Sequence, residues 1–277
     1  MKNILTLFIG TLLLTSCANE PEVLEWASTN QFKVEGVNPI GLAVTKDGLW
    51  LSDGDHNRLV NIDAEGKIIK SVDGFERPMH IASQSDVIYV PEYGTDTVKQ
   101  VNAEKVSAIS LNDSLDAPAG IDIYNNEKAI ADFYNNRILY FNGTDWISFG
   151  KEGKAEGDFY YPTDVQITED EIWVADAYNN RVQVFDKSGN FKKVIGADQK
   201  MNAATGIYVS DDELFVTDFE NDRVLIFDLD GQLKQELSEN IEKPTDMLIY
   251  NNELYIINYR NSIVNVFQQK AVKVEKE

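Results

Sequence analysis

Cysteine, histidine and positive charge are all scarce in this chain. Its 277 residues include one cysteine and two histidines, so an internal disulfide and the paired Cys/His motifs of zinc modules are excluded. Lysine and arginine number 25 against 46 aspartates and glutamates, which gives a formal net charge of -21. Because so acidic a surface repels phosphate groups, neither nucleic acid nor an anionic membrane surface is an expected direct partner.

The N-terminus has the features of an export signal. Lys2 precedes an apolar run, residues 4–14, that is too short to span a bilayer. The run leads into Leu-Thr-Ser-Cys ending at Cys17, which resembles the Leu-x-x-Cys box of bacterial lipoproteins. The resemblance implies a signal peptide over residues 1–16, cleavage and lipidation at Cys17, and an acidic tether over residues 17–30. It also implies a place in the bacterial cell envelope, on the periplasmic or outer-membrane surface, with membrane contact only through the lipid. A plain secretory signal with a chance cysteine is the alternative.

A pattern of three short apolar stretches recurs six times along the chain, at intervals of about 40 residues. The clearest copy, residues 162–186, opens on Pro162, ends its second stretch at Asp176 and begins its third at Arg181. The residues at the position of Asp176 are Asp53, Glu92, Asp132, Asp176, Asp218 and Asn258. The period predicts an all-β, six-bladed β-propeller over residues 31–277, with four antiparallel strands in each blade. Either residues 31–36 or residues 271–275 would supply the strand that closes the ring.

The repeat resembles the NHL family. Residues 162–165 (Pro-Thr-Asp-Val), 174–176 (Val-Ala-Asp) and 179–182 (Asn-Asn-Arg-Val) carry that family's pattern. The resemblance implies the propeller fold, but not one activity, because the family includes ligand binders, RNA binders, scaffolds and a few enzymes. The second blade departs most, with Glu92 for aspartate and Pro91 inside a strand, which predicts a bulge or an irregular strand end there.

Four blades repeat an acidic residue followed by an arginine. A carboxylate that clasps an arginine and loop N–H groups would fix the turn in each blade, and a feature repeated so often favours architecture over catalysis. The alternative is a ring of ligand-binding or catalytic carboxylates. The pairs are Asp53/Arg58, Asp132/Arg137, Asp176/Arg181 and Asp218/Arg223.

The third residue of each repeat, counted from the opening proline or its equivalent, differs between odd and even blades. Glycine alternates there with a polar residue, through Gly41, His80, Gly120, Asp164, Gly206 and Asp246. One imidazole and two carboxylates from alternate blades could hold Ca²⁺ or Zn²⁺ at the channel mouth, with His56 and Glu92 as possible neighbours. The alternative is that each aspartate caps a turn. No other cofactor is expected.

Aromatic residues follow the acidic position in most blades. They could form a collar at the channel mouth that stacks on sugars or apolar ligands, or they could pack between blades. The candidates are Tyr93, Phe133, Tyr134, Tyr178, Phe219 and Tyr259.

The leading functional prediction is non-enzymatic binding, through the loop face, of an envelope protein, a glycan or a small ligand. The alternative is a metal-dependent hydrolase or lactonase with a divalent metal at the channel mouth. The amidating lyases that share this repeat use three zinc-bound histidines, of which this chain has too few. The chain resembles gluconolactonase-type propellers more loosely, and their metal-binding motif does not occur in this sequence.

Overall fold

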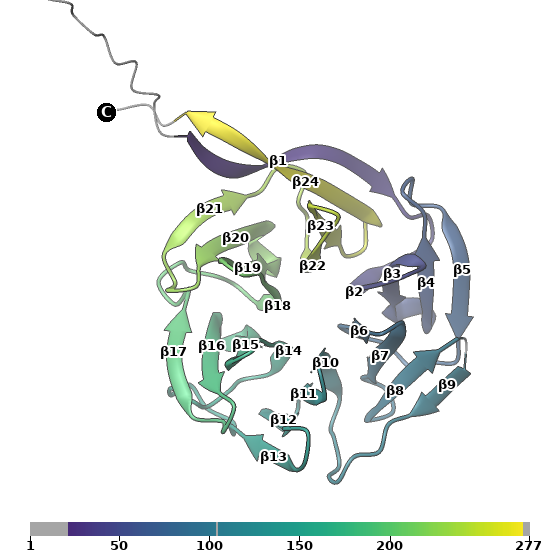
Figure 1. Ribbon diagram of the computed structural model, residues 1–277, viewed down its shortest axis with the longest axis vertical. Helices are drawn as coiled ribbons and strands as arrows, with labels where there is room; N and C mark the ends of the chain where they lie inside the picture. The colour runs from purple at the N-terminus through teal and green to yellow at the C-terminus, as the bar shows by residue number, and fades with distance from the viewer. Residues whose placement is uncertain (1–21, 104, 274–277) are drawn as a thin grey trace, which may run out of the picture.

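A computed structural model describes residues 22–103 and 105–273, and it confirms the predicted six-bladed β-propeller. Six four-stranded antiparallel sheets surround a central channel (Figure 1). The predicted signal peptide and Cys17 lie outside the described residues. No helix in the described ranges is long and apolar enough to cross a membrane.

In blades 1 to 5 the strands run outward from the channel in sequence order, and in blade 6 the outermost strand is the N-terminal β1. Blades 1 to 3 contain β2 (Pro39–Thr45), β3 (Gly48–Asp53), β4 (Arg58–Ile62) and β5 (Ile68–Asp73); β6 (Ala82–Gln84), β7 (Val87–Glu92), β8 (Thr97–Asn102) and β9 (Lys105–Ala108); and β10 (Pro118–Tyr124), β11 (Glu127–Asp132), β12 (Arg137–Phe141) and β13 (Trp146–Phe149). Blades 4 and 5 contain β14 (Pro162–Ile167), β15 (Glu171–Asp176), β16 (Arg181–Asp186) and β17 (Phe191–Ile195); and β18 (Ala204–Val209), β19 (Glu213–Asp218), β20 (Arg223–Asp228) and β21 (Leu233–Leu237). Blade 6 contains β22 (Pro244–Tyr250), β23 (Glu253–Asn258), β24 (Ile263–Lys273) and β1 (Glu22–Lys33). Three single-turn 3₁₀ helices follow second strands: η1 (Gly54–His56), η2 (Ala177–Asn179) and η3 (Phe219–Asn221).

The hydrophobic core is divided among the spaces between blades. Because successive strand residues point to opposite faces, each blade packs one set of apolar side chains on each neighbour. Between blades 4 and 5, for example, Trp173 and Val184 pack with Leu214 and Phe227 of the next blade. The inner strands therefore stand edge-on to the channel, and their backbones lie close to the axis.

The N-terminal strand β1 closes the ring, which corrects the predicted tether. β1 pairs antiparallel with β24 from Glu22↔Lys273 to Lys33↔Ile263, so residues 22–30 belong to blade 6 and are not a tether. In Figure 1 the far ends of both strands project beyond the ring. Residues 271–273, the other candidate for closure, lie at the end of β24 in the same pair. Pairing the first described strand with the last satisfies two sheet edges at once.

Pro91 does not disturb its own strand, which corrects the predicted bulge or irregular strand end; the short strand of blade 2 is the neighbouring one. Pro91 pairs with Val98 without a register shift. Its other neighbour, β6, is reduced to Ala82–Gln84, and only an isolated bridge joins Pro78 to Glu92. Because proline has no N–H, Pro91 can only accept from the inner segment, and its carbonyl receives the Met79 N–H at 3.1 Å.

Candidate functional site: the loop face and the channel mouth

Buried aspartates end the second strands of four blades. Each carboxylate accepts a hydrogen bond from the arginine Nε at 2.7–2.8 Å and another from a backbone N–H that precedes the first strand. The pairs are Asp53/Arg58, Asp132/Arg137, Asp176/Arg181 and Asp218/Arg223. All four aspartates have no exposed surface, so these contacts fix the loops and leave no carboxylate open to a ligand.

The two neighbours suggested for a metal lie in contacts of their own. His56 Nδ1 is 2.7 Å from Asp53, and Glu92 accepts hydrogen bonds from Lys99 and from the backbone of Glu76. Both are therefore engaged in the loops of blades 1 and 2, away from the channel axis.

The loops after the second strands share a face with the segments that precede the first strands. The backbone N–H groups of Tyr93, Tyr134 and Tyr178 donate to carbonyls of those segments, at 3.1–3.2 Å. This loop face carries the predicted aromatic residues. The three blades concerned, 2 to 4, are consecutive, so their aromatic side chains fall next to one another.

One continuous aromatic cluster covers the loop face of blades 2, 3 and 4. Ring centroids lie 4.5–6.4 Å apart, with both stacked and edge-on pairs. We call this cluster the aromatic patch; it consists of Tyr93, Phe133, Tyr134, Tyr160, Tyr161 and Tyr178. Tyr134 and Tyr178 are 45% and 57% exposed, which is unusual for large aromatic side chains. The rings therefore pack on one another and still present two phenol side chains to solvent.

Tyr160 and Tyr161 belong to the aromatic patch although the repeat pattern did not indicate them. They directly precede Pro162, in the segment that reaches the loop face, and this position was the signal available in the sequence. Tyr161 stacks on Phe133 at 4.8 Å with an interplanar angle of 12°, so it joins blade 3 to blade 4. Its positive φ of 57° is a strained conformation for tyrosine and turns the ring into the cluster.

The other two predicted aromatic residues form a separate pair. Phe219 and Tyr259 lie 6.5 Å apart on blades 5 and 6, with Lys243 over the first ring and Arg260 over the second. The Tyr259 hydroxyl donates to Asp55 of blade 1. The aromatic side chains thus make a patch and a pair instead of a closed collar.

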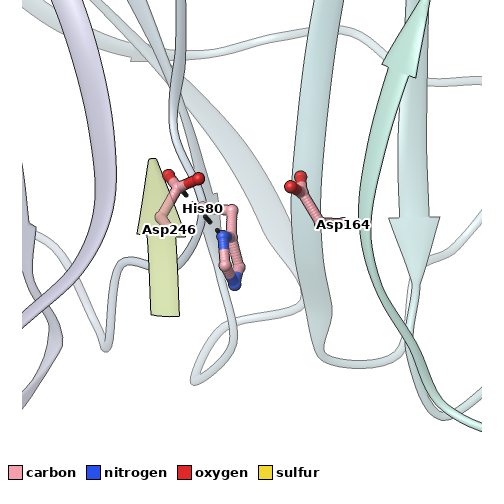
Figure 2. A group of neighbouring side chains, drawn as sticks. All are labelled: His80, Asp164 and Asp246. Atoms are coloured by element: carbon pink, nitrogen blue, oxygen red, sulfur yellow. Dashed lines mark ion pairs between the residues drawn. The ribbon is translucent and has the colours of Figure 1, made fainter. Parts of the chain in front are cut away.

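The structure brings His80, Asp164 and Asp246 together. One ligand atom from each lies within 4.8 Å of the others, and the residues are only 4%, 7% and 6% exposed. Figure 2 shows the His80 ring between the two carboxylates, with Nδ1 directed at Asp246. The distance from Nδ1 to Asp246 Oδ2 is 3.7 Å, within ion-pair range but too long for a hydrogen bond. We call these three residues the channel triad.

Close backbone packing explains why glycine alternates with these residues. A Cβ on Gly41, Gly120 or Gly206 would lie 2.2–2.6 Å from a carbonyl oxygen of the next blade, so no larger residue fits. The oxygens belong to Met79, Thr163 and Thr245, each directly before a triad residue. The odd blades therefore carry glycine, and the space around the axis is left to the even blades.

Each triad carboxylate is oriented by two backbone N–H groups. Asp164 accepts from Val165 in its own strand and from Ile207 of blade 5, both at 2.9 Å. Asp246 accepts from its neighbour Met247 and from Leu42 of blade 1, both at 2.8 Å. A bulge between the opening proline and each aspartate re-aims these side chains along the ring. The aspartates thus tie neighbouring blades together.

Burial and mutual proximity perturb the triad's proton affinities. Burial, with a smaller contribution from Asp246, raises the pKa of Asp164 to about 7, although His80 opposes the change. Burial alone would lower the pKa of His80, but the two carboxylates outweigh it and raise that pKa. Near neutral pH the triad therefore holds protons that isolated carboxylates would release.

Several hollows lie away from the aromatic patch. A channel cavity of about 230 Å³ is lined by inner-strand residues of all six blades, including Asp122, Asp164 and Asp246. A second hollow, of about 850 Å³, lies between blades 4 and 5 beside the turns that join first and second strands, at Thr168 and Ser210. The channel gives the triad a route to solvent.

Known proteins share this architecture. Residues 151–262 match the model of a family described as 6-bladed beta-propeller. No curated protein matches the chain significantly. A gluconolactonase from Xanthomonas campestris superposes with a TM-score of 0.72 at 12% identity, covering 89% of this chain and 90% of its own.

Two further solved structures are similar. Virginiamycin B lyase from Staphylococcus aureus gives a TM-score of 0.65 at 14% identity, covering 88% of this chain and 99% of its own. A chain of a nidogen/laminin complex gives 0.60 at 16% identity, covering 72% and 79%. At these identities the likeness establishes the fold alone, and the similar structures include two enzymes and a chain of one protein complex.

Proposed function

We propose that this protein is a non-enzymatic binding protein that recognises a glycan through its aromatic patch, at the bacterial cell envelope. The observation that carries the proposal is the continuous set of rings on blades 2 to 4 with Tyr134 and Tyr178 exposed. The apolar faces of sugar rings stack on aromatic rings, while phenol hydroxyls bond to sugar hydroxyls. Strand-supported loops hold the rings in place, so little entropy is lost on binding.

The net charge of the protein limits the classes of glycan that it can bind. A net charge of -21 disfavours anionic polysaccharides, so the expected ligand is uncharged or cationic. A neutral or amino-bearing glycan fits both the charge and the rings. Lipid attachment at Cys17, proposed from the signal box, would keep the patch near such glycans.

The test is binding of neutral and amino-sugar oligosaccharides from the envelope, measured by calorimetry on the chain from residue 18. Tyr134→Ala and Tyr178→Ala should each weaken binding about tenfold, because each removes an exposed stacking surface. Ile69→Ala, which truncates a 61% exposed side chain on β5, is the matched control and should bind normally.

Two results would count against glycan binding. Oligosaccharides that bind equally well to both tyrosine variants would place the site elsewhere. Failure of every oligosaccharide, together with an envelope protein whose binding is lost in the same variants, would turn the patch into a protein-docking surface.

A metal-dependent hydrolase or lactonase at the channel mouth is the second candidate function. The convergence of His80, Asp164 and Asp246 favours it, and two enzymes share the fold. Substrate would have to reach residues that are less than a tenth exposed, and both carboxylates already accept backbone hydrogen bonds. Hydrolysis of lactones or esters that is lost in Asp164→Asn would establish this function.

A further inference from the structure

The channel triad contains a buried nitrogen without a partner. His80 Nδ1 has no hydrogen-bond partner, and the residue is 4% exposed. A buried polar atom left unpaired costs about 1–3 kcal/mol, so its environment calls for an explanation. The nearest charged atom, Asp246 Oδ2 at 3.7 Å, lies beyond hydrogen-bond distance, and Asp164 lies on the other side of the ring (Figure 2).

The two carboxylates can accept more than they do. Each oxygen of Asp164 and Asp246 receives one backbone N–H, which leaves a second lone pair on every oxygen. Backbone donors of this kind fix the orientation of a carboxylate, as outer-shell partners do around protein metal sites. The triad therefore offers one nitrogen and at least two pre-oriented oxygens to a shared point.

We propose that the channel triad binds one Zn²⁺ ion that joins blades 2, 4 and 6 at the propeller axis. One histidine nitrogen and two carboxylate oxygens match the ligands of zinc, whereas Ca²⁺ takes six to eight oxygens. Zinc bonds of about 2.0–2.2 Å at tetrahedral angles separate ligand atoms by about 3.4 Å. His80 Nδ1 and Asp246 Oδ2 lie 3.7 Å apart, and no two of the three ligand atoms are more than 4.8 Å apart, so a small inward movement of the side chains would bring them to that separation.

The proposed role of the ion is structural. Asp164 already connects blade 4 to blade 5, and Asp246 connects blade 6 to blade 1. His80 occupies the corresponding place in blade 2, where its backbone N–H donates to Ala119 of blade 3 but its side-chain Nδ1 makes no such bond. An ion held by all three residues would connect the His80 side chain of blade 2 to blades 4 and 6. It would also cancel the repulsion between the two buried carboxylates. The channel cavity, which Asp164 and Asp246 line, is the entry path.

The experiment measures zinc binding and thermal stability of the chain from residue 18, which contains the whole propeller. Metal-free protein is titrated with ZnCl₂ in a calorimeter, and the melting temperature is recorded with and without zinc. We expect one ion per chain and a rise of several degrees at zinc concentrations a hundredfold above Kd. His80→Asn should weaken binding at least a hundredfold and abolish the rise, and Asp246→Asn should act in the same direction.

His56→Ala is the matched control, because it removes the other histidine, which is 48% exposed beside Asp53. It should bind zinc like the unaltered protein. Circular dichroism of each metal-free variant verifies that it folds. A metal-free protein that binds no zinc, or zinc binding that survives His80→Asn but not His56→Ala, would overturn the proposal. Neither outcome depends on the aromatic patch, and zinc binding without hydrolysis would support the structural role.

Discussion

Replacing Trp26 by alanine tests whether β1 closes the propeller. Trp26 is 6% exposed, packs edge-on against Phe215 at 5.7 Å, and donates its indole N–H to Glu213 of blade 5. Its backbone also exchanges two hydrogen bonds with the side chain of Gln235 in β21. This one residue therefore fastens blade 6 to blade 5 across the closure.

The cost of the change follows from the buried surface. A buried tryptophan removes about 150–250 Å² from water, which at about 25 cal/mol per Å² sets an upper limit of about 4–6 kcal/mol. Measured truncations of buried aromatic residues give about 3–5 kcal/mol. For a domain of this size, such a loss should lower the melting temperature by about 10 °C.

The assay is scanning calorimetry of Trp26→Ala beside Leu24→Ala, on the chain from residue 18. Leu24 lies two residues away on the same strand but is 60% exposed, so its truncation should change the free energy of unfolding by less than about 0.5 kcal/mol. If Trp26→Ala melts no lower than Leu24→Ala, β1 does not close the ring and the reasoning fails.

Two further changes test the blade architecture. Asp176→Ala leaves the buried Arg181 guanidinium without its carboxylate, so it should lower the free energy of unfolding by about 3–5 kcal/mol in chemical denaturation. A decrease below about 1 kcal/mol would show that the ion pair between these two residues does not fix the loop. Burial raises the pKa of Asp122 from 3.8 to about 6, so the folded chain binds this proton more tightly than the unfolded chain. The stabilisation is present below about pH 4 and is lost as pH rises through about 6, by up to about 3 kcal/mol, a dependence that Asp122→Asn should remove. Equal pH dependence of the two proteins would contradict this.

The repeat predicted the fold because the residues that define it interact with residues close to them in the sequence. Side chains of residues 181–186 point alternately to the two faces of the blade, and Asp176 lies five residues before Arg181. The repeat therefore already contained the ion pair between Asp176 and Arg181. The triad also followed from local pattern, since a fixed position in alternate blades must point to a common axis. In contrast, residues 17–30 were predicted to be an acidic tether, although residues 22–30 belong to β1, because the partner strand begins about 240 residues later.

The sequence by itself determined the number of blades, the clasp residues and the three residues that meet at the axis, because each depends on a period that is written into the chain. Only the tertiary structure decided which terminal strand closes the ring, that Tyr160 and Tyr161 join an aromatic patch, and that His80 Nδ1 lies buried without a partner. These features arise where segments from different blades meet. Packing between elements distant in sequence sets burial and contact there, and no single repeat contains that information.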